Sequence, residues 1–263
     1  MSITNIKNIL LVSSGKGGVG KSMVAVNTAY ALSQNGYKTG ILDADFYGPS
    51  VPLAMGIRDQ RLTSKKEGGK ELFYPIIKHG IKVNSLGFMM NPEDPVIWRG
   101  PLASSALNQL LHDTIWEELD FLVLDMPPGT GDIAISIVQQ LPNANAIVVT
   151  TPQEMAVADA RKAANMFLSQ GMDIKVLGVV ENMSWFTPQE HPEEKYFLFG
   201  KGGGAQLAHE ISTSLLAQIP LVAEVGTCAD QGKPIYATDQ KPILDAFDQL
   251  IEKILDETLV TVA

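Results

Sequence analysis

The sequence predicts an α/β fold in which a single doubly wound, mostly parallel sheet is flanked by helices on both faces. Short apolar segments alternate with segments of helical length along the chain, a pattern that right-handed βαβ units produce. A glycine-rich loop joins the first apolar segment to the first helical one, and two further apolar segments end in aspartates. No repeat, low-complexity segment or linker divides the chain, so we expect one domain over residues 1–263.

In the first half of the chain, each element follows from a local pattern. Apolar residues 9–12 predict a strand, and the helix over 23–34 ends at Asn35 and Gly36, a common helix stop. Four further segments are expected: a strand at 38–43, a loop or broken helix start at 46–56, a polar hairpin tip or mobile loop at 65–71, and a small pair of strands at 73–77 and 81–86.

In the second half, Pro101 suits the first residue of a helix, because the first turn of a helix leaves its N–H groups unpaired. A fully apolar strand ends in Asp125, and strands and helices then alternate to the end of the chain. The expected elements are helix 101–111, strand 121–125, loop 126–132, helix 133–140, strand 146–150, helix 154–169, strand 176–181 and helices 205–211 and 242–255.

The composition restricts the class of protein. The chain is 45% hydrophobic, so it can bury a large core, and its net charge of −9 argues against a nucleic-acid-binding surface. The single cysteine, Cys228, fits a reducing compartment. The N-terminus lacks a signal-peptide pattern, and no apolar run reaches the roughly 18 residues of a membrane helix. We therefore expect a cytoplasmic protein with neither nucleic-acid nor membrane partners.

Residues 13–22, Ser-Ser-Gly-Lys-Gly-Gly-Val-Gly-Lys-Ser, fill every fixed position of the phosphate-loop pattern between a strand and a helix. Glycines let backbone N–H groups converge on phosphate oxygens, and the following helix directs its positive end at the same anion. Lys21 is expected on the β- and γ-phosphates, and the Ser22 hydroxyl on Mg²⁺. The predicted nucleotide-binding residues are Gly15, Lys16, Gly17, Gly18, Val19, Gly20, Lys21 and Ser22.

Carboxylates follow two of the predicted strands. Asp125 ends a strand about a hundred residues after the phosphate loop, the place of the Mg²⁺-binding aspartate in such enzymes. Asp43 and Asp45 follow a second strand, and either could orient the water that attacks the γ-phosphate. We favour Asp45 because it lies in the loop proper, and we retain Asp43 as the other candidate. The competing interpretation is that these aspartates only cap turns.

Lys16 is a second lysine in the loop, where the phosphate-loop pattern does not require one. It could neutralise transition-state charge as an arginine finger does, and its own nucleotide is awkward for it to reach. The segment Lys-Gly-Gly-Val-Gly-Lys-Ser at 16–22 resembles the deviant Walker-A ATPases, the group of MinD, ParA, ArsA and the nitrogenase iron protein. The resemblance implies a homodimer in which Lys16 reaches the partner's nucleotide as a catalytic residue.

Four motifs narrow the resemblance. They are Asp-Ala-Asp-Phe-Tyr-Gly-Pro-Ser at 43–50, Trp-Arg-Gly-Pro at 98–101, Asp-Met-Pro-Pro-Gly-Thr-Gly-Asp at 125–132 and Glu-Asn-Met-Ser at 181–184. Over residues 6–256 the chain is similar to the Mrp/ApbC branch, P-loop ATPases of iron–sulfur cluster assembly and carriage. The resemblance implies ATP and Mg²⁺ as cofactors, apoprotein clients, Asn182 at the adenine base, Asp45 as the catalytic carboxylate and Asp125 at Mg²⁺.

The chain departs from this family at one place. Many members carry a Cys-x-x-Cys pair after the Glu-Asn-Met-Ser motif, and two subunits bind a bridging cluster through those thiolates. Residues 185–195 of this chain contain no cysteine. A cluster ordinarily takes four thiolates, so two outcomes are open: a labile iron–sulfur cluster at Cys228 with help from residues such as His191, or an ATPase that holds no cluster itself. We favour the second.

Two rival functions belong to the same superfamily. An organiser of the MinD type would dock on membrane through a basic amphipathic helix, whereas the C-terminal segment here is rich in acidic residues. A ParA-type ATPase would bind DNA, and the negative net charge counts against that function. These features count against both rivals, and we keep a MinD/ParA-like spatial organiser as the alternative to the iron–sulfur function.

Overall fold

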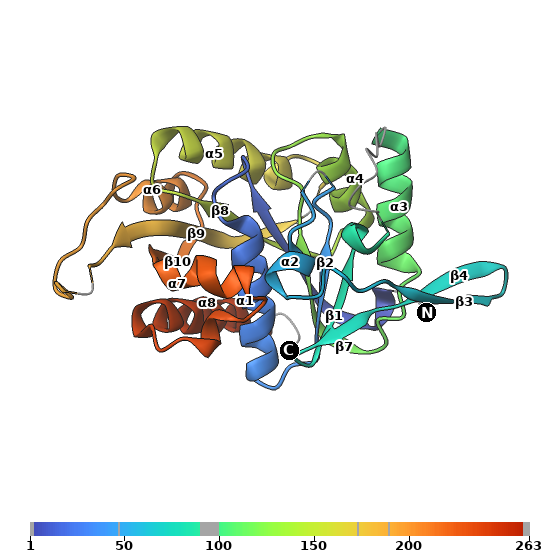
Figure 1. Cartoon of the computed structure of the whole chain (residues 1–263). Coiled ribbons are helices and arrows are strands. Elements are labelled where there is room, and N and C mark those ends of the chain that lie inside the picture. Colours follow the sequence, from blue (N-terminus) through green and yellow to red (C-terminus); the bar gives the residue numbers. More distant parts are fainter. Residues whose placement is uncertain (1–2, 47, 90–99, 173, 189, 260–263) are drawn as a thin grey trace.

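The computed structural model describes residues 3–46, 48–89, 100–172, 174–188 and 190–259. Its main feature is an eight-stranded sheet with the order β10-β9-β8-β1-β7-β2-β6-β5, covered by helices (Figure 1). All neighbouring strands are parallel except β5 and β6. The strands are β1 (Ile6–Ser14), β2 (Thr39–Asp43), β5 (Ile76–Lys78), β6 (Ile81–Ser85), β7 (Leu119–Asp125), β8 (Asn145–Thr150), β9 (Lys175–Phe186) and β10 (Ser214–Leu221).

The helices pack on both faces of this sheet because its strands are apolar on both sides. Leu10 and Val12 of β1 belong to the core under one helical layer, and Leu11 to the core under the other. One layer contains α1 (Lys21–Gln34), α2 (Val51–Ala54), α7 (Ala223–Asp230) and α8 (Lys241–Leu259). The other contains α3 (Gly100–His112), α4 (Asp132–Gln140), α5 (Glu154–Leu168) and α6 (Gly203–Glu210). The predicted doubly wound fold is confirmed.

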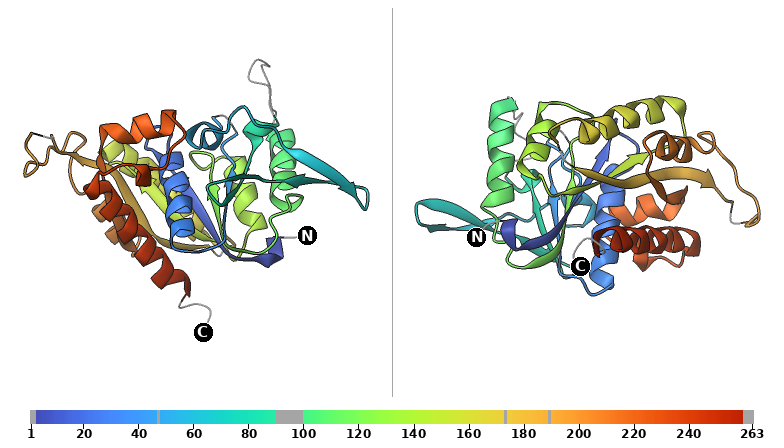
Figure 2. Two further views of the ribbon diagram at one scale, coloured as in Figure 1. Left: turned by 60° about the horizontal axis from the view of Figure 1, so that its bottom comes forward. Right: turned by 180° about the vertical axis from the view of Figure 1, so that it is seen from behind.

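A separate antiparallel hairpin, β3 (Thr63–Glu67) and β4 (Lys70–Tyr74), contains the polar segment expected as a hairpin tip. Its turn residues Gly68 and Gly69 have φ values of 59° and 81°, which suit a two-residue turn. The hairpin projects from one end of the molecule, and the carboxyl end of β9 points toward the other (Figure 2).

Several elements differ from the expected ones. The small pair of strands is β5 and β6, but β6 also pairs in parallel with β2 and so extends the main sheet. Strand β9 continues five residues beyond the expected end, through Asn182 to Phe186. Strand β10 and helix α7 have no counterpart among the predicted elements. Pro220 lies inside β10, where it lacks a donor, and the position of this strand at the sheet edge accommodates it.

Tyr47, Trp98 and Arg99 of the quoted motifs lie outside the described residues. Helix α3 begins at Gly100, one residue before Pro101. Over the parts of the chain that the structure describes, each helix is too short or too polar to cross a lipid bilayer.

Candidate nucleotide site

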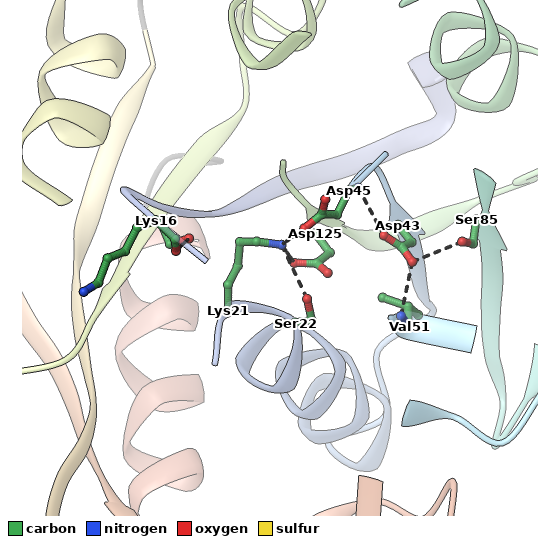
Figure 3. Close-up of polar contacts among 9 residues, drawn as sticks. Lys16, Lys21, Ser22, Asp43, Asp45, Val51, Ser85 and Asp125 are labelled. Carbon is green, nitrogen blue, oxygen red and sulfur yellow. Dashed lines mark hydrogen bonds and ion pairs between the residues drawn. The ribbon is translucent and has the colours of Figure 1, made fainter. Parts of the chain in front are cut away.

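The candidate site lies where three neighbouring parallel strands, β1, β7 and β2, reach their carboxyl ends. Val12 of β1 is the register partner of Asp125 in β7, and Asp125 is the partner of Asp43 in β2. Backbone hydrogen bonds continue past the strand ends, from Ala44 N to Asp125 O at 2.9 Å and from Met126 N to Val12 O at 3.0 Å. The residues predicted from separate motifs therefore meet at one edge of the sheet (Figure 3).

The loop between β1 and α1 lies close to its neighbours because it is rich in glycine. A Cβ atom on Gly15 would overlap the backbone of Asp159 in α5, and one on Gly20 would overlap the side chain of Asn182. Gly20 also has a φ of 83°, a conformation that L side chains rarely adopt. The loop then leads directly into Lys21, the first residue of α1, so the amino end of this helix faces the site.

Lys21 joins the two acidic strand ends. Its side chain is 6% exposed, and its Nζ lies 2.5 Å from Asp125 Oδ1 and 3.4 Å from Asp45 Oδ2 (Figure 3). The Ser22 hydroxyl is 3.4 Å from the same nitrogen. One ammonium group thus contacts both carboxylates that the sequence placed at this edge.

Asp125 keeps one acceptor unused. Its Oδ2 is buried and makes no hydrogen bond with the described residues, an arrangement that is rare for a buried carboxylate. Burial raises the pKa of Asp125, while the Lys21 ammonium and a hydrogen bond from Ser22 oppose this shift. A carboxylate oxygen and a serine hydroxyl side by side are the ligand types that Mg²⁺ takes in phosphate-loop enzymes, so the residues present fit this ion.

A cavity of about 280 Å³ opens over the loop. It is lined by Lys16, Gly17, Gly18, Gly20, Lys21, Ser22, Met23, Asp45, Ser50 and Pro128. A larger cavity of about 450 Å³ lies at the opposite edge of the sheet, at the amino ends of β2, β6 and β7. Of these two cavities, the phosphate loop and Asp45 border the smaller one, which is therefore the candidate nucleotide cavity.

Lys16 and Asn182 lie on different sides of the loop. The Lys16 side chain points away from Lys21 in Figure 3, and its ammonium group has no hydrogen bond or ion pair within the described parts of the chain. Asn182 in β9 is 1% exposed, and its Nδ2 donates a 2.9 Å hydrogen bond to Val19 O. Asn182 therefore supports the loop directly.

Asp43 lies behind Asp45. Its carboxylate is fully buried and accepts hydrogen bonds from Asp45 N, Val51 N and Ser85 Oγ, each at 3.1 Å. Burial first, and the nearby Asp125 carboxylate second, raise the pKa of Asp43 to about 8. Ser85 is a site residue that the sequence did not indicate, and its only signal was its position at the end of a strand.

The two candidate iron ligands are placed differently. Cys228 is buried in α7 at 8% exposure, whereas His191 is an exposed residue 4.0 Å from Glu194. Over the described residues, no three His, Cys, Asp or Glu side chains gather closely enough to hold a metal ion. The residues present therefore do not fit a cluster held within one copy of the chain.

The fold and the site define the class of this protein. A glycine-rich loop between a central parallel strand and a helix, with a lysine that contacts two strand-end carboxylates, is the nucleotide-binding site of a P-loop NTPase. The model of one particular family, described as the NUBPL iron-transfer P-loop NTPase, matches residues 5–255, and the chain belongs to this family.

Individual relatives agree with this membership. The iron-sulfur cluster carrier protein of Haemophilus influenzae is 48% identical over 97% of this chain, which spans 68% of that protein. A nucleotide-binding protein of Archaeoglobus fulgidus, solved in complex with ADP, is 32% identical, with a TM-score of 0.78 and 94% of each chain covered.

The cell-division ATPase MinD of Pyrococcus furiosus shares the fold alone. It is 20% identical, with a TM-score of 0.66 over 95% of this chain and 99% of its own. The identities therefore favour the iron–sulfur relatives over the MinD-like alternative.

Proposed function

We propose that the chain is an ATP-hydrolysing protein that serves the assembly of iron–sulfur clusters and their transfer to apoprotein clients. One observation carries the proposal: Lys21 contacts both Asp125 and Asp45 in a chain that is 48% identical to a named cluster carrier. We further propose that residues 1–263 work as a single domain in the cytoplasm. A lone cysteine among 263 residues supports the reducing compartment.

The site residues divide the work of hydrolysis. The loop N–H groups and Lys21 bind the phosphates. Ser22 and Asp125 would hold Mg²⁺, which would supply charge neutralisation at the phosphate oxygens. Asp45 orients the attacking water, since its carboxylate borders the cavity 3.4 Å from Lys21 Nζ. Asn182, whose Nδ2 donates to Val19 O of the loop, would contact the adenine base.

We also propose that the loop is of the deviant Walker-A type and that two copies form a nucleotide-dependent homodimer. The support is the direction of Lys16, whose side chain leaves the site of its own chain (Figure 3). In a two-fold dimer each Lys16 would reach the partner's nucleotide and stabilise charge in the transition state.

The cluster is cargo in this proposal, and this chain does not bind it alone. The chain offers one thiolate, Cys228, so two copies offer two, whereas a [4Fe–4S] cluster ordinarily takes four. His191 does not complete the set within one copy, because no metal-holding group of three forms among the described residues.

Two measurements on the purified protein test the proposal. Mg²⁺-dependent release of phosphate from ATP is expected from the wild type, and its absence contradicts the ATPase function. Anaerobic reconstitution with ferrous iron and sulfide is expected to leave substoichiometric iron, which Cys228→Ser leaves unchanged. A stable brown dimer with about four irons, bleached by Cys228→Ser, would overturn the view that this chain holds no cluster itself.

A further inference from the structure

The Asp43 carboxylate joins three segments that surround the nucleotide cavity. Its Oδ1 accepts from Asp45 N, at the start of the loop that follows β2, and its Oδ2 accepts from Val51 N, the first residue of α2. The same Oδ2 accepts from Ser85 Oγ, at the end of β6 (Figure 3). Both ends of the segment 45–51 are therefore held by one side chain.

The burial of these groups separates the roles of the two aspartates. Asp43 is 0% exposed, and each of its oxygens already accepts a hydrogen bond, so it has no free face toward a water in the cavity. Asp45 lines the cavity with a side chain that is 13% exposed. Of these two aspartates, Asp45 is therefore the one placed to contact a water in the cavity.

We propose that Asp43 is the positioning residue of the hydrolytic reaction: its carboxylate fixes the backbone at Asp45 and at Val51 so that Asp45 faces Lys21 and the cavity. This inference rests on the proposed ATPase function. Three donors converge on Asp43, two of them backbone N–H groups of the segment that it positions. A misplacement of about 1 Å at a catalytic group costs roughly 100-fold in rate.

Ser85 provides the second contact in this arrangement. Its hydroxyl donates to Asp43 Oδ2 and also accepts from Gly87 N at 3.0 Å, so β6 and the turn after it hold the carboxylate in place. Ser85→Ala therefore removes one of the three donors without touching the segment 45–51 itself. We expect Ser85→Ala to disturb the position of Asp45 less than Asp43→Asn does, because two of the three donors to Asp43 remain.

The test compares four single variants: Asp43→Asn, Ser85→Ala, Asp45→Asn and Asp120→Asn. An amide at position 43 places an NH₂ group against a backbone N–H, so one of the hydrogen bonds to the segment is lost. Asp120, which pairs with Lys7 Nζ at 2.8 Å near the amino end of β7, gives the same chemical change far from the cavity. ATP affinity, kcat and KM, and thermal melting are measured for each.

The expected result separates kcat from binding. Asp43→Asn lowers kcat by roughly tenfold or more with ATP affinity within about threefold of wild type, and Ser85→Ala lowers kcat by a smaller factor. Asp120→Asn leaves kcat and affinity unchanged.

Wild-type kcat in Asp43→Asn overturns the proposal, as does a joint loss of kcat and affinity that Asp120→Asn reproduces. If Asp43→Asn does not fold, unchanged kcat in Ser85→Ala overturns it.

Hydrogen–deuterium exchange of the peptide that covers residues 44–54 gives a readout that needs no ATPase activity. Exchange there is expected to be faster in Asp43→Asn and Ser85→Ala than in wild type and Asp120→Asn. In Asp43→Asn one of the Asp45 and Val51 amides loses its acceptor, and in Ser85→Ala the carboxylate that accepts from both amides is held less firmly. Equal exchange in all four proteins overturns the inference. If the wild type hydrolyses no ATP, the proposed function is contradicted. The exchange result still tests whether Asp43 holds the backbone amides of Asp45 and Val51.

Discussion

Lys21 contacts two carboxylates with one buried ammonium group, and nucleotide binding must redistribute this charge. The lysine forms ion pairs with Asp125 at 2.5 Å and with Asp45 at 3.4 Å. We expect phosphates that enter the cavity to give the lysine a third set of acceptors and to leave the two aspartates available to Mg²⁺ and water. Lys21 therefore forms its two ion pairs with the aspartates that we propose for Mg²⁺ binding and for catalysis.

We expect Lys21→Ala to weaken ATP binding by roughly 100-fold or more, because the β- and γ-phosphates lose their main countercharge and donor. The variant also leaves the buried Asp125 carboxylate and the partly exposed Asp45 carboxylate without their cation, so its melting temperature without nucleotide should fall. Isothermal titration with ATP and thermal melting measure the two effects. Wild-type affinity in this variant would show that the lysine does not bind the phosphates.

We expect Asp45→Asn to keep ATP affinity and to lose turnover by roughly 100-fold or more, since only the placement of the water changes. Phosphate release at saturating Mg-ATP measures the rate, and equilibrium titration measures the affinity. Normal turnover would remove Asp45 from the mechanism and return Asp43 as the candidate, against the burial of that side chain.

The site could be predicted from the sequence as far as its residues lie in local patterns. Asp45 and Asp125 come at the ends of apolar runs and Lys21 at the end of the glycine-rich loop, and parallel strands bring such positions to one edge. Ser85 could not be assigned, because its contact with Asp43 depends on the pairing of β6 with β2 across about forty residues of chain. The unused Oδ2 of Asp125 likewise depends on three-dimensional packing.

At the scale of elements, the segment after β2 is anchored by the contact between the ends of α2 and α7. Gly56, just after α2, and Gly232, just after α7, have φ values of 64° and 63°, and their backbones lie against each other. A Cβ on Gly232 would overlap the backbone of Gly56, so no larger residue fits without movement. This contact fixes the chain at the carboxyl end of α2, beyond Asp45 and Val51, which Asp43 holds.

Gly232→Ala should therefore cost more stability than a left-handed φ alone explains. Gly36 has a φ of 87°, and a Cβ atom placed on it would meet open space within 4 Å, which makes Gly36→Ala the matched control. We expect a loss of about 1 to 2 kcal/mol for Gly36→Ala from the backbone conformation. For Gly232→Ala we expect roughly 2 kcal/mol more from the overlap. Urea unfolding measures both, and equal losses would contradict the close contact.

The elements that the sequence did not predict share a physical reason. Strand β10 contains Gln218 and Pro220, which interrupt the apolar run, and its pairing with β9 is irregular between Ile219 and Leu221. This segment forms a strand because it pairs with β9 at the sheet edge, and the β propensity of its own residues does not reveal that pairing. By contrast, the boundary of α1 at Gln34 agrees with the expected stop, because Asn35 and Gly36 signal it locally.

At the scale of the whole molecule, Lys16 is the feature that a single copy leaves unexplained. The loop places this lysine at the rim of the nucleotide cavity, yet its side chain points away from the Lys21 cluster (Figure 3). No hydrogen bond or ion pair holds its ammonium group within the residues that the structure describes. A second copy, facing this edge of the sheet across a two-fold axis, would bring a nucleotide to it.

The proposed dimer gives a prediction that depends on Lys16 alone. The Asp45→Asn protein should bind Mg-ATP without consuming it, so light scattering at saturating Mg-ATP should report a dimer, and at saturating ADP a monomer. Adding Lys16→Ala should return the Mg-ATP form toward the monomer and weaken ADP binding less than dimerisation, because the lysine acts on the partner's phosphates. Lys175→Ala removes the same charge from β9, where Lys175 pairs with Glu257 at 2.7 Å, and should leave the dimer intact.

A strictly monomeric Asp45→Asn protein under saturating Mg-ATP would contradict the homodimer. A dimer that both lysine variants weaken equally would instead attribute the effect to net charge, since an exposed charge contributes through the general field of the protein.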